Sequence, residues 1–158
     1  MIFTENNYKF MFAALAEAEK ALDNDDIPVG AVVVKDDRII GKGYNQVQLL
    51  HDPTAHAEML AITAASNHLQ SSNLTGCELY VSLEPCSMCA GALINARISK
   101  LFFSTFEPKY GACGSVFNLV ESNAVNHKVE VYSGIYEEES KKLLKDFFES
   151  LRNHKDNL

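Results

Sequence analysis

The first part of the chain repeats apolar residues with the period of an α-helix. Tyr8, Met11, Leu15, Ala18 and Leu22 recur every three or four positions and would form one apolar stripe. The polar run DNDD follows directly and interrupts this pattern. We therefore expect an N-terminal amphipathic helix that ends at this polar run.

A pattern typical of strands comes next. Pro28 leads into VGAVVVKDDRIIGKGYN, residues 29–45, in which two runs rich in β-branched residues flank Asp36 and Asp37. Two such runs separated by a pair of turn-forming residues predict a β-hairpin.

The rest of the chain alternates between helical and strand patterns. We expect strands over 77–83, 100–105 and 128–134, and a short helix between the last two of them. We expect longer helices over 51–69, capped by Asp52 or Thr54, and from Pro85 to about Ala96. A final helix should run from about 136 to 152, and the residues on its apolar face are Leu143, Leu144, Phe147, Phe148 and Leu151. This order predicts one α/β domain over residues 1–158, with a mixed sheet of about five strands and helices on both faces. The order of the strands does not follow from the sequence.

Composition adds limits to this picture. The 158 residues are 47% hydrophobic and 22% charged, as in an ordinary globular protein, and the net charge of −7 argues against indiscriminate nucleic-acid binding. No apolar run reaches the roughly 18 residues of a membrane helix. The N-terminal segment lacks a basic region and carries Glu17 and Glu19, so we do not interpret it as a signal peptide. We expect a cytoplasmic protein with no membrane contact, in a compartment where disulfides are rare.

Two cysteines three residues apart are the first candidates for chemistry. Cys86 and Cys89, in VSLEPCSMCAGAL, would share one face of the first turn of a helix, with Pro85 as its first residue. A helix N-terminus favours the thiolate form of cysteine. This geometry suits a redox pair as well as half of a metal site, so the pair alone does not decide between them.

His56 and Glu58 lie at the start of the preceding predicted helix, in TAHAEM. One imidazole and two thiolates form a soft donor set suited to zinc, and three protein ligands leave a fourth position open, as in catalytic sites. A structural zinc site would need a fourth ligand, such as Cys77, Cys113 or another histidine. Both of these cysteines are isolated in the sequence, and we expect them to pack in the core.

Glu58 is not needed as a ligand and can act as a proton shuttle. Zinc lowers the pKa of water, and a nearby carboxylate can transfer its proton to a ring nitrogen and then to a departing amine. The pattern H-x-E followed by P-C-x-x-C is that of zinc-dependent nucleobase deaminases. Positions i and i+2 do not share a helix face. His56 and Glu58 can therefore serve one site only if the metal lies over the helix end.

Longer stretches of the chain add a family resemblance. The segments concerned are IPVGAVVV, GYN, HDPTAHAEML, LYVSLEPCSMCAGALINARI, PKYGACGS, NHKVEVYSGI and LLKDFFESLR. Over nearly its full length the chain resembles the bacterial tRNA adenosine deaminases (the TadA family) of the cytidine-deaminase superfamily.

The resemblance implies a homodimeric enzyme that converts the wobble adenosine of a tRNA anticodon stem-loop to inosine. It implies one Zn²⁺ per subunit, bound by His56, Cys86 and Cys89, and attack of activated water at adenine C6 with Glu58 as the proton shuttle. The substrate contacts that it implies are Asn45, the backbone amide of Ala57, Glu107, Lys109, Phe147 and Phe148.

Some positions depart from the family pattern. Gln46, Leu50 and Glu149 occupy positions that are often basic in the family, and Glu107 stands where we expect Asp. The remaining candidates for phosphate contacts are Lys109, Lys128, Lys141, Lys142, Lys145 and Arg152.

Two other functions stay open. One is a deaminase of a free nucleobase or nucleoside (guanine, cytosine or cytidine) with the same zinc centre. The other is a binding module that zinc stabilises and that has no catalytic activity.

Overall fold

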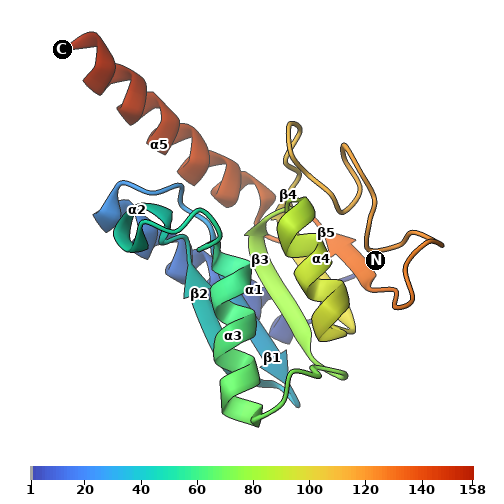
Figure 1. The fold of residues 1–158 in the computed structure, drawn as a ribbon. Coiled ribbons are helices and arrows are strands. Elements are labelled where there is room, and N and C mark those ends of the chain that lie inside the picture. Colours follow the sequence, from blue (N-terminus) through green and yellow to red (C-terminus); the bar gives the residue numbers. More distant parts are fainter. Residues whose placement is uncertain (1) are drawn as a thin grey trace.

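A five-stranded mixed sheet forms the centre of the molecule in the computed structural model, which describes residues 2–158 (Figure 1). The strands are β1 (Gly30–Lys35), β2 (Arg38–Tyr44), β3 (Glu78–Leu83), β4 (Lys100–Thr105) and β5 (Glu130–Ser133). Their order in the sheet is β2-β1-β3-β4-β5. β1 is antiparallel to β2 and β3, whereas β3, β4 and β5 are parallel. The predicted mixed sheet of about five strands is confirmed.

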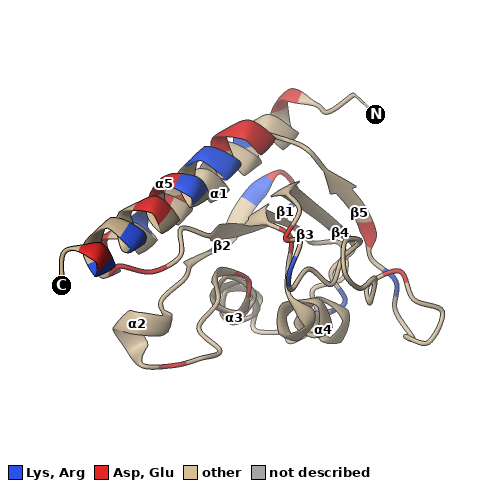
Figure 2. Ribbon diagram, turned by 90° about the horizontal axis from the view of Figure 1, so that it is seen from above, with Lys and Arg blue, Asp and Glu red and all other residues tan. Residues whose placement is uncertain are grey.

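Helices cover both faces of this sheet, as predicted. They are α1 (Glu5–Ala21) with a 3-10 turn (Leu22–Asn24), α2 (Val47–Leu50), α3 (Ala57–Leu69), α4 (Ser87–Ala96) and α5 (Glu137–Asp156). Seen along the sheet, α1 and α5 lie on one face while α3 and α4 lie on the other (Figure 2). The C-terminal turns of α5 extend beyond the sheet (Figure 1). In the described part of the chain, no helix is both long enough and apolar enough to cross a membrane.

Close backbone contacts fix α3 against the hairpin. The hairpin turn follows the prediction, with Asp36 and Asp37 both at positive φ. A Cβ atom on Gly43 would lie 2.3 Å from the carbonyl oxygen of Ala57, and one on Gly41 would lie 2.5 Å from that of Ala61. Only glycine allows α3 to approach β2 so closely. The start of α3 is therefore held at the end of β2.

The predicted apolar stripe of the first helix is wrong in part. Met11 and Ala18 are buried, but Tyr8 is 42% and Leu22 38% exposed. Phe10, which lies outside the expected stripe, packs with Met11 against the sheet. At Gly30 the helix comes closer still, because a Cβ atom there would lie 2.1 Å from the carbonyl oxygen of Ala14. The helix therefore packs closely on β1 through its alanines, and Tyr8 makes an edge contact with Tyr136 beside α5.

Three predicted details of the helices are also wrong. α3 begins at Ala57 and not near Asp52, whose carboxylate accepts hydrogen bonds from the N–H and the hydroxyl of Thr54 and so stabilises a local turn. Pro85 precedes α4, because Cys86 is its N-cap. The chain between β4 and β5 contains no helix, whereas the short helix α2 precedes α3.

Candidate active site

His56, Cys86 and Cys89 meet where two helices begin. His56 is the N-cap of α3 and Cys86 is the N-cap of α4. The Nδ1 atom of His56 lies 3.7 Å from the sulfur of Cys86 and 3.6 Å from that of Cys89. The three donor atoms all lie within 4.8 Å of one another. The structure thus brings together the three residues that the sequence nominated as ligands.

These distances can be compared with those that a metal ion requires. Zn–N and Zn–S bonds of about 2.05 and 2.3 Å at a tetrahedral angle place the nitrogen about 3.6 Å from each sulfur. The observed separations of 3.6 and 3.7 Å match this value. Among residues 2–158, the cluster contains these three residues and no fourth ligand. Cys77 and Cys113 instead pack in the hydrophobic core.

Hydrogen bonds within the cluster favour a thiolate. A hydrogen bond from Cys89 lowers the pKa of the Cys86 thiol to about 3. The same bond, with burial, raises the pKa of Cys89. The bond to Cys86 raises the pKa of the His56 imidazole. Because thiolates are the form of cysteine that binds soft metals, this electrostatic arrangement suits a metal centre.

Glu58 lies beside this cluster and is nearly inaccessible to solvent. Its side chain is 4% exposed, and it belongs to the first turn of α3. Burial raises the pKa of the Glu58 carboxyl, and a hydrogen bond with Cys89 partly opposes this shift. His56 and Glu58 share one site because the cluster lies over the open end of α3, the arrangement that the sequence argument required. A buried carboxyl with a raised pKa holds a proton more readily than an exposed one, which suits a group that must accept a proton and then return it.

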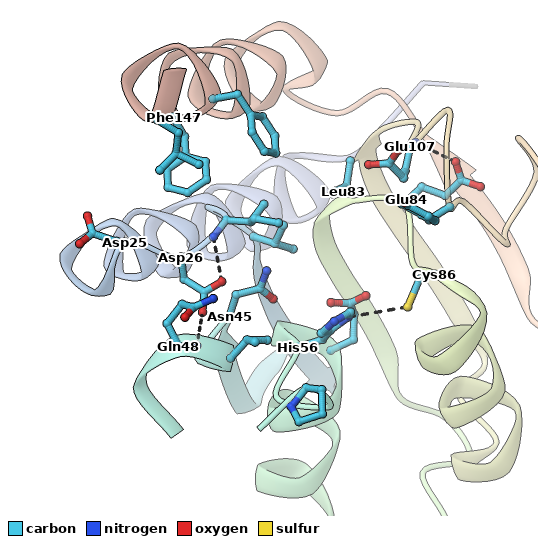
Figure 3. A pocket seen from close by; sticks show the side chains of 18 residues that line it. Asp25, Asp26, Asn45, Gln48, His56, Leu83, Glu84, Cys86, Glu107 and Phe147 are labelled. Carbon is cyan, nitrogen blue, oxygen red and sulfur yellow. Dashed lines mark hydrogen bonds between the residues drawn. The ribbon is translucent and has the colours of Figure 1, made fainter. Parts of the chain in front are cut away.

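His56, Glu58 and Cys86 line a pocket with a volume of about 500 Å³ (Figure 3). Its walls come from the 25–29 turn, the segment from Asn45 to Glu58, the residues that follow β3, the loop after β4, and α5. Phe147 of α5 lies across the pocket from His56 (Figure 3), and Phe148, which is 43% exposed, also lines the pocket. The pocket thus combines apolar walls with a few polar groups, as is usual for sites that bind small aromatic groups.

Other residues nominated from the sequence occupy different places. Asn45 lines the pocket, and its Oδ1 accepts a hydrogen bond of 2.9 Å from the backbone N–H of Ala57. The amide nominated for substrate contact is therefore already bonded to Asn45. Glu107 lines the pocket, but Lys109 is exposed and does not, although its N–H donates to Glu107 Oε1 at 2.8 Å.

Two buried carboxylates of the pocket wall were missed from the sequence. Asp26 is 4% exposed and accepts hydrogen bonds from the N–H groups of Ile27 and Gln48, which joins two wall segments. Glu84 is 2% exposed and accepts hydrogen bonds from the loop after β4. The sequence offers little signal for them, because the partners that make them part of the wall, Gln48 for Asp26 and the loop after β4 for Glu84, are distant in the sequence.

The pocket has an acidic and apolar character. Among the described residues, its lining includes neither Lys nor Arg but includes the exposed Asp25 and the half-buried Glu107. Three lysines nominated for phosphate contacts lie on α5 and pair with acids of the same helix. Such exposed pairs contribute little stability and leave the lysines accessible, but they reduce the positive charge along the helix.

Comparisons with known proteins agree with this geometry. The family model for MafB19-like deaminases matches residues 5–152. A tRNA-specific adenosine deaminase from Aquifex aeolicus (strain VF5) is 48% identical over 92% of this chain and 95% of its own. One from Bacillus subtilis (strain 168) is 42% identical over 92% of this chain and 91% of its own.

A solved structure is similar as well. It comes from work on A-to-I editing by tRNA:A34 deaminases at the wobble position of transfer RNA. The TM-score is 0.83 at 43% identity, over 86% of this chain and 99% of that one. The fold and the site together define a deaminase of the cytidine-deaminase-like fold. The chain belongs to the tRNA-specific adenosine deaminase family.

Proposed function

We propose that this protein is a hydrolytic deaminase that converts the wobble adenosine of a tRNA anticodon loop to inosine and releases ammonia. The observation that carries the proposal is the His56, Cys86 and Cys89 cluster beside buried Glu58 at the base of a pocket. Relatives that cover nearly the whole chain are named tRNA-specific adenosine deaminases, which supports this substrate.

His56, Cys86 and Cys89 would hold one zinc ion per subunit. Zinc in such a site supplies Lewis-acid activation of water at neutral pH. Glu58 would accept one proton of the attacking water and deliver it to the ring nitrogen next to adenine C6, the carbon under attack. It would then carry the second proton, from the new hydroxyl on C6, to the departing amine, which leaves as ammonia while C6 keeps the oxygen as a carbonyl. Its burial and raised pKa favour this exchange, because the protonated and ionised forms are then closer in energy.

Asn45 and the two phenylalanines would orient the base. Because Asn45 Oδ1 is bonded to Ala57, its Nδ2 group is the part left to donate to a ring nitrogen of the substrate. Phe147 and Phe148 provide apolar faces on which bases can stack. A target adenosine in a loop can turn out of its stack at low cost, so the pocket need not open a duplex.

We also propose that the protein is a homodimer formed through α3 and α4. The described residues of α4 include no Asp, Glu, Lys or Arg, and the single charged residue of α3 is buried Glu58. In Figure 2, both helices are almost entirely tan, the colour of uncharged residues. The solvent-facing side of a helix usually carries charged residues. We therefore infer that a second copy of this chain packs on the uncharged faces of α3 and α4. Because the proposed substrate is tRNA, we also propose that the enzyme acts in the cytoplasm.

The proposed activity is tested with zinc-loaded protein and an anticodon stem-loop carrying adenosine at position 34. Inosine and ammonia are measured, in parallel with free adenosine, guanine and cytosine. We expect inosine in the stem-loop at a far higher rate than any product from the free compounds. A Glu58→Gln variant that retains zinc excludes a contaminating activity.

A free nucleobase deaminase is the second candidate. The absence of Lys and Arg from the lining of the described pocket favours it, because phosphate contacts supply much of RNA affinity. Ammonia from guanine or cytosine with an unchanged stem-loop would support this candidate over the first.

A further inference from the structure

The carboxylate of Glu84 accepts three hydrogen bonds in the pocket wall, and the mechanism proposed above does not use it. Its Oε1 accepts a hydrogen bond of 3.0 Å from the N–H of Glu107, and this bond is drawn in Figure 3. Its Oε2 accepts bonds from the N–H groups of Cys113 at 3.0 Å and Ser115 at 3.1 Å. One side chain thus joins both ends of the segment 107–115.

Among the residues that the structure describes, no cation pairs with this carboxylate. Glu84 is 2% exposed, and no ion pair within residues 2–158 includes it. A buried carboxylate without hydrogen bonds would be strongly disfavoured. The three backbone N–H groups therefore compensate the cost of burying it, and they do so only while the segment keeps its present shape.

The backbone of the segment is shaped around this side chain. A Cβ atom on Gly111 would lie 2.3 Å from Oε1 of Glu84, so no other residue fits there without a shift. Gly111 forms an isolated β-bridge with Cys86, and the N–H of Ala112 donates to the carbonyl of Pro85 at 2.9 Å. The segment that Glu84 holds is therefore also bonded to the backbone at the metal cluster.

The same segment carries two residues of the pocket. Glu107 and Tyr110 both line it, and Tyr110 is 69% exposed. The hydroxyl of Ser115 donates to the carbonyl of Glu107 at 2.9 Å, which closes the segment on itself. Because the segment contains no helix or strand, these few bonds determine where Glu107 and Tyr110 lie.

We propose that Glu84 is a positioning residue of the deamination reaction. Its carboxylate fixes segment 107–115, so that Glu107 and Tyr110 are already in place at the mouth of the pocket when the anticodon loop binds. This inference rests on the proposed function. A loop ordered before binding costs less entropy when the substrate binds, so the effect falls on substrate binding more than on the chemical step.

The test is Glu84→Gln, which keeps the size of the side chain but replaces one acceptor oxygen by a donor. Hydrogen exchange of the amides in 107–115 should accelerate roughly 10- to 100-fold, as expected for a lost buried hydrogen bond. KM for the stem-loop should rise about tenfold while kcat stays within about threefold of the wild-type value. Zinc content should stay at one per chain. The control is Glu121→Gln, an exposed carboxylate beyond the segment.

The inference is overturned if exchange in 107–115 is unchanged, or if exchange accelerates while KM keeps its wild-type value. If Glu84→Gln does not fold, Ser115→Ala removes an exposed hydroxyl that closes the same segment. It should raise both exchange and KM, and an unchanged value of either would reject the proposal. A wild-type protein inactive on the stem-loop contradicts the proposed function instead, since hydrogen exchange needs no substrate.

Discussion

The side-chain oxygen of Asn45 accepts a hydrogen bond of 2.9 Å from the backbone N–H of Ala57. This bond joins the residue that follows β2 to the first residue of α3, next to the N-cap histidine. It uses the oxygen of the Asn45 side chain and leaves the NH₂ group for the pocket, since Asn45 also lines it. One residue thus holds the helix start and, under the proposed function, would also donate a hydrogen bond to the base.

These two roles can be separated by substitution. Asn45→Asp keeps the acceptor for Ala57 and removes the NH₂ donor, whereas Asn45→Ala removes both. We expect kcat/KM for the stem-loop to fall roughly 10- to 100-fold in both variants, as for a lost buried hydrogen bond. The thermal midpoint should fall further in Asn45→Ala. Wild-type kcat/KM in Asn45→Asp would show that the NH₂ group does not bind the substrate.

Glu58→Gln tests the proton shuttle. A glutamine fills the same volume but cannot carry a proton between water and the base. We expect kcat to fall about 10²- to 10⁴-fold, with zinc content unchanged. Glu139→Gln, an exposed carboxylate on α5, is the control and should keep full activity. A binding module without catalysis would show no difference between the two variants in any assay.

Metal content distinguishes the cysteines. Cys89→Ala should lose bound zinc and with it all activity, whereas Cys77→Ala should retain one zinc per chain. Cys77 is buried in the core, so its loss should cost stability, about 1 kcal/mol for a small cavity, but not metal. Elemental analysis of the dialysed proteins measures this difference. Loss of zinc in Cys77→Ala would show that the cluster depends on more than its three ligands.

The hairpin and the grouping of His56, Cys86 and Cys89 could be predicted because their causes are local. Two β-branched runs around Asp36 and Asp37 specify a turn whose residues both adopt positive φ. His56 and Cys86 were recognised by residue type and spacing, and the helix N-termini explain why they meet. In each case, short stretches of sequence contain the physical reason.

The parts that could not be predicted depend on distant contacts. Segment 107–115 takes its shape from Glu84, which lies outside it, so no local pattern reveals it. The orientation of α1 depends on Gly30 of the neighbouring strand, which lets the backbone of the helix at Ala14 and Ala18 approach β1 closely. The start of α3 was placed too early, because the turn at Asp52 competes locally with a helix.

Gly91→Arg tests the proposed dimer surface on α4. A Cβ atom on Gly91 meets no atom within 4 Å, so the isolated chain tolerates a side chain there. At an interface between two copies, the arginine would bring a charge and a large volume into the contact. Light scattering should give about twice 17.5 kDa for the wild type and 17.5 kDa for the variant. Asn153→Arg, exposed on α5, should stay dimeric, and a dimeric Gly91→Arg would place the interface elsewhere.

Ser140→Ala tests how α5 is anchored over the pocket. The hydroxyl of Ser140 is buried and donates to the carbonyl oxygen of Ser82 at 2.5 Å, which ties α5 to β3 just before Cys86. Its removal leaves a buried carbonyl without this donor, so we expect the free energy of unfolding to fall by about 1–3 kcal/mol. Because α5 carries Phe147 and Phe148, KM for the stem-loop should rise while kcat changes less. Denaturant titration and steady-state kinetics measure both effects, and Ser150→Ala, exposed on the same helix, should change neither. If Ser140→Ala lost stability but kept the wild-type KM, the bond would serve the fold alone, and other contacts would set the place of the phenylalanines.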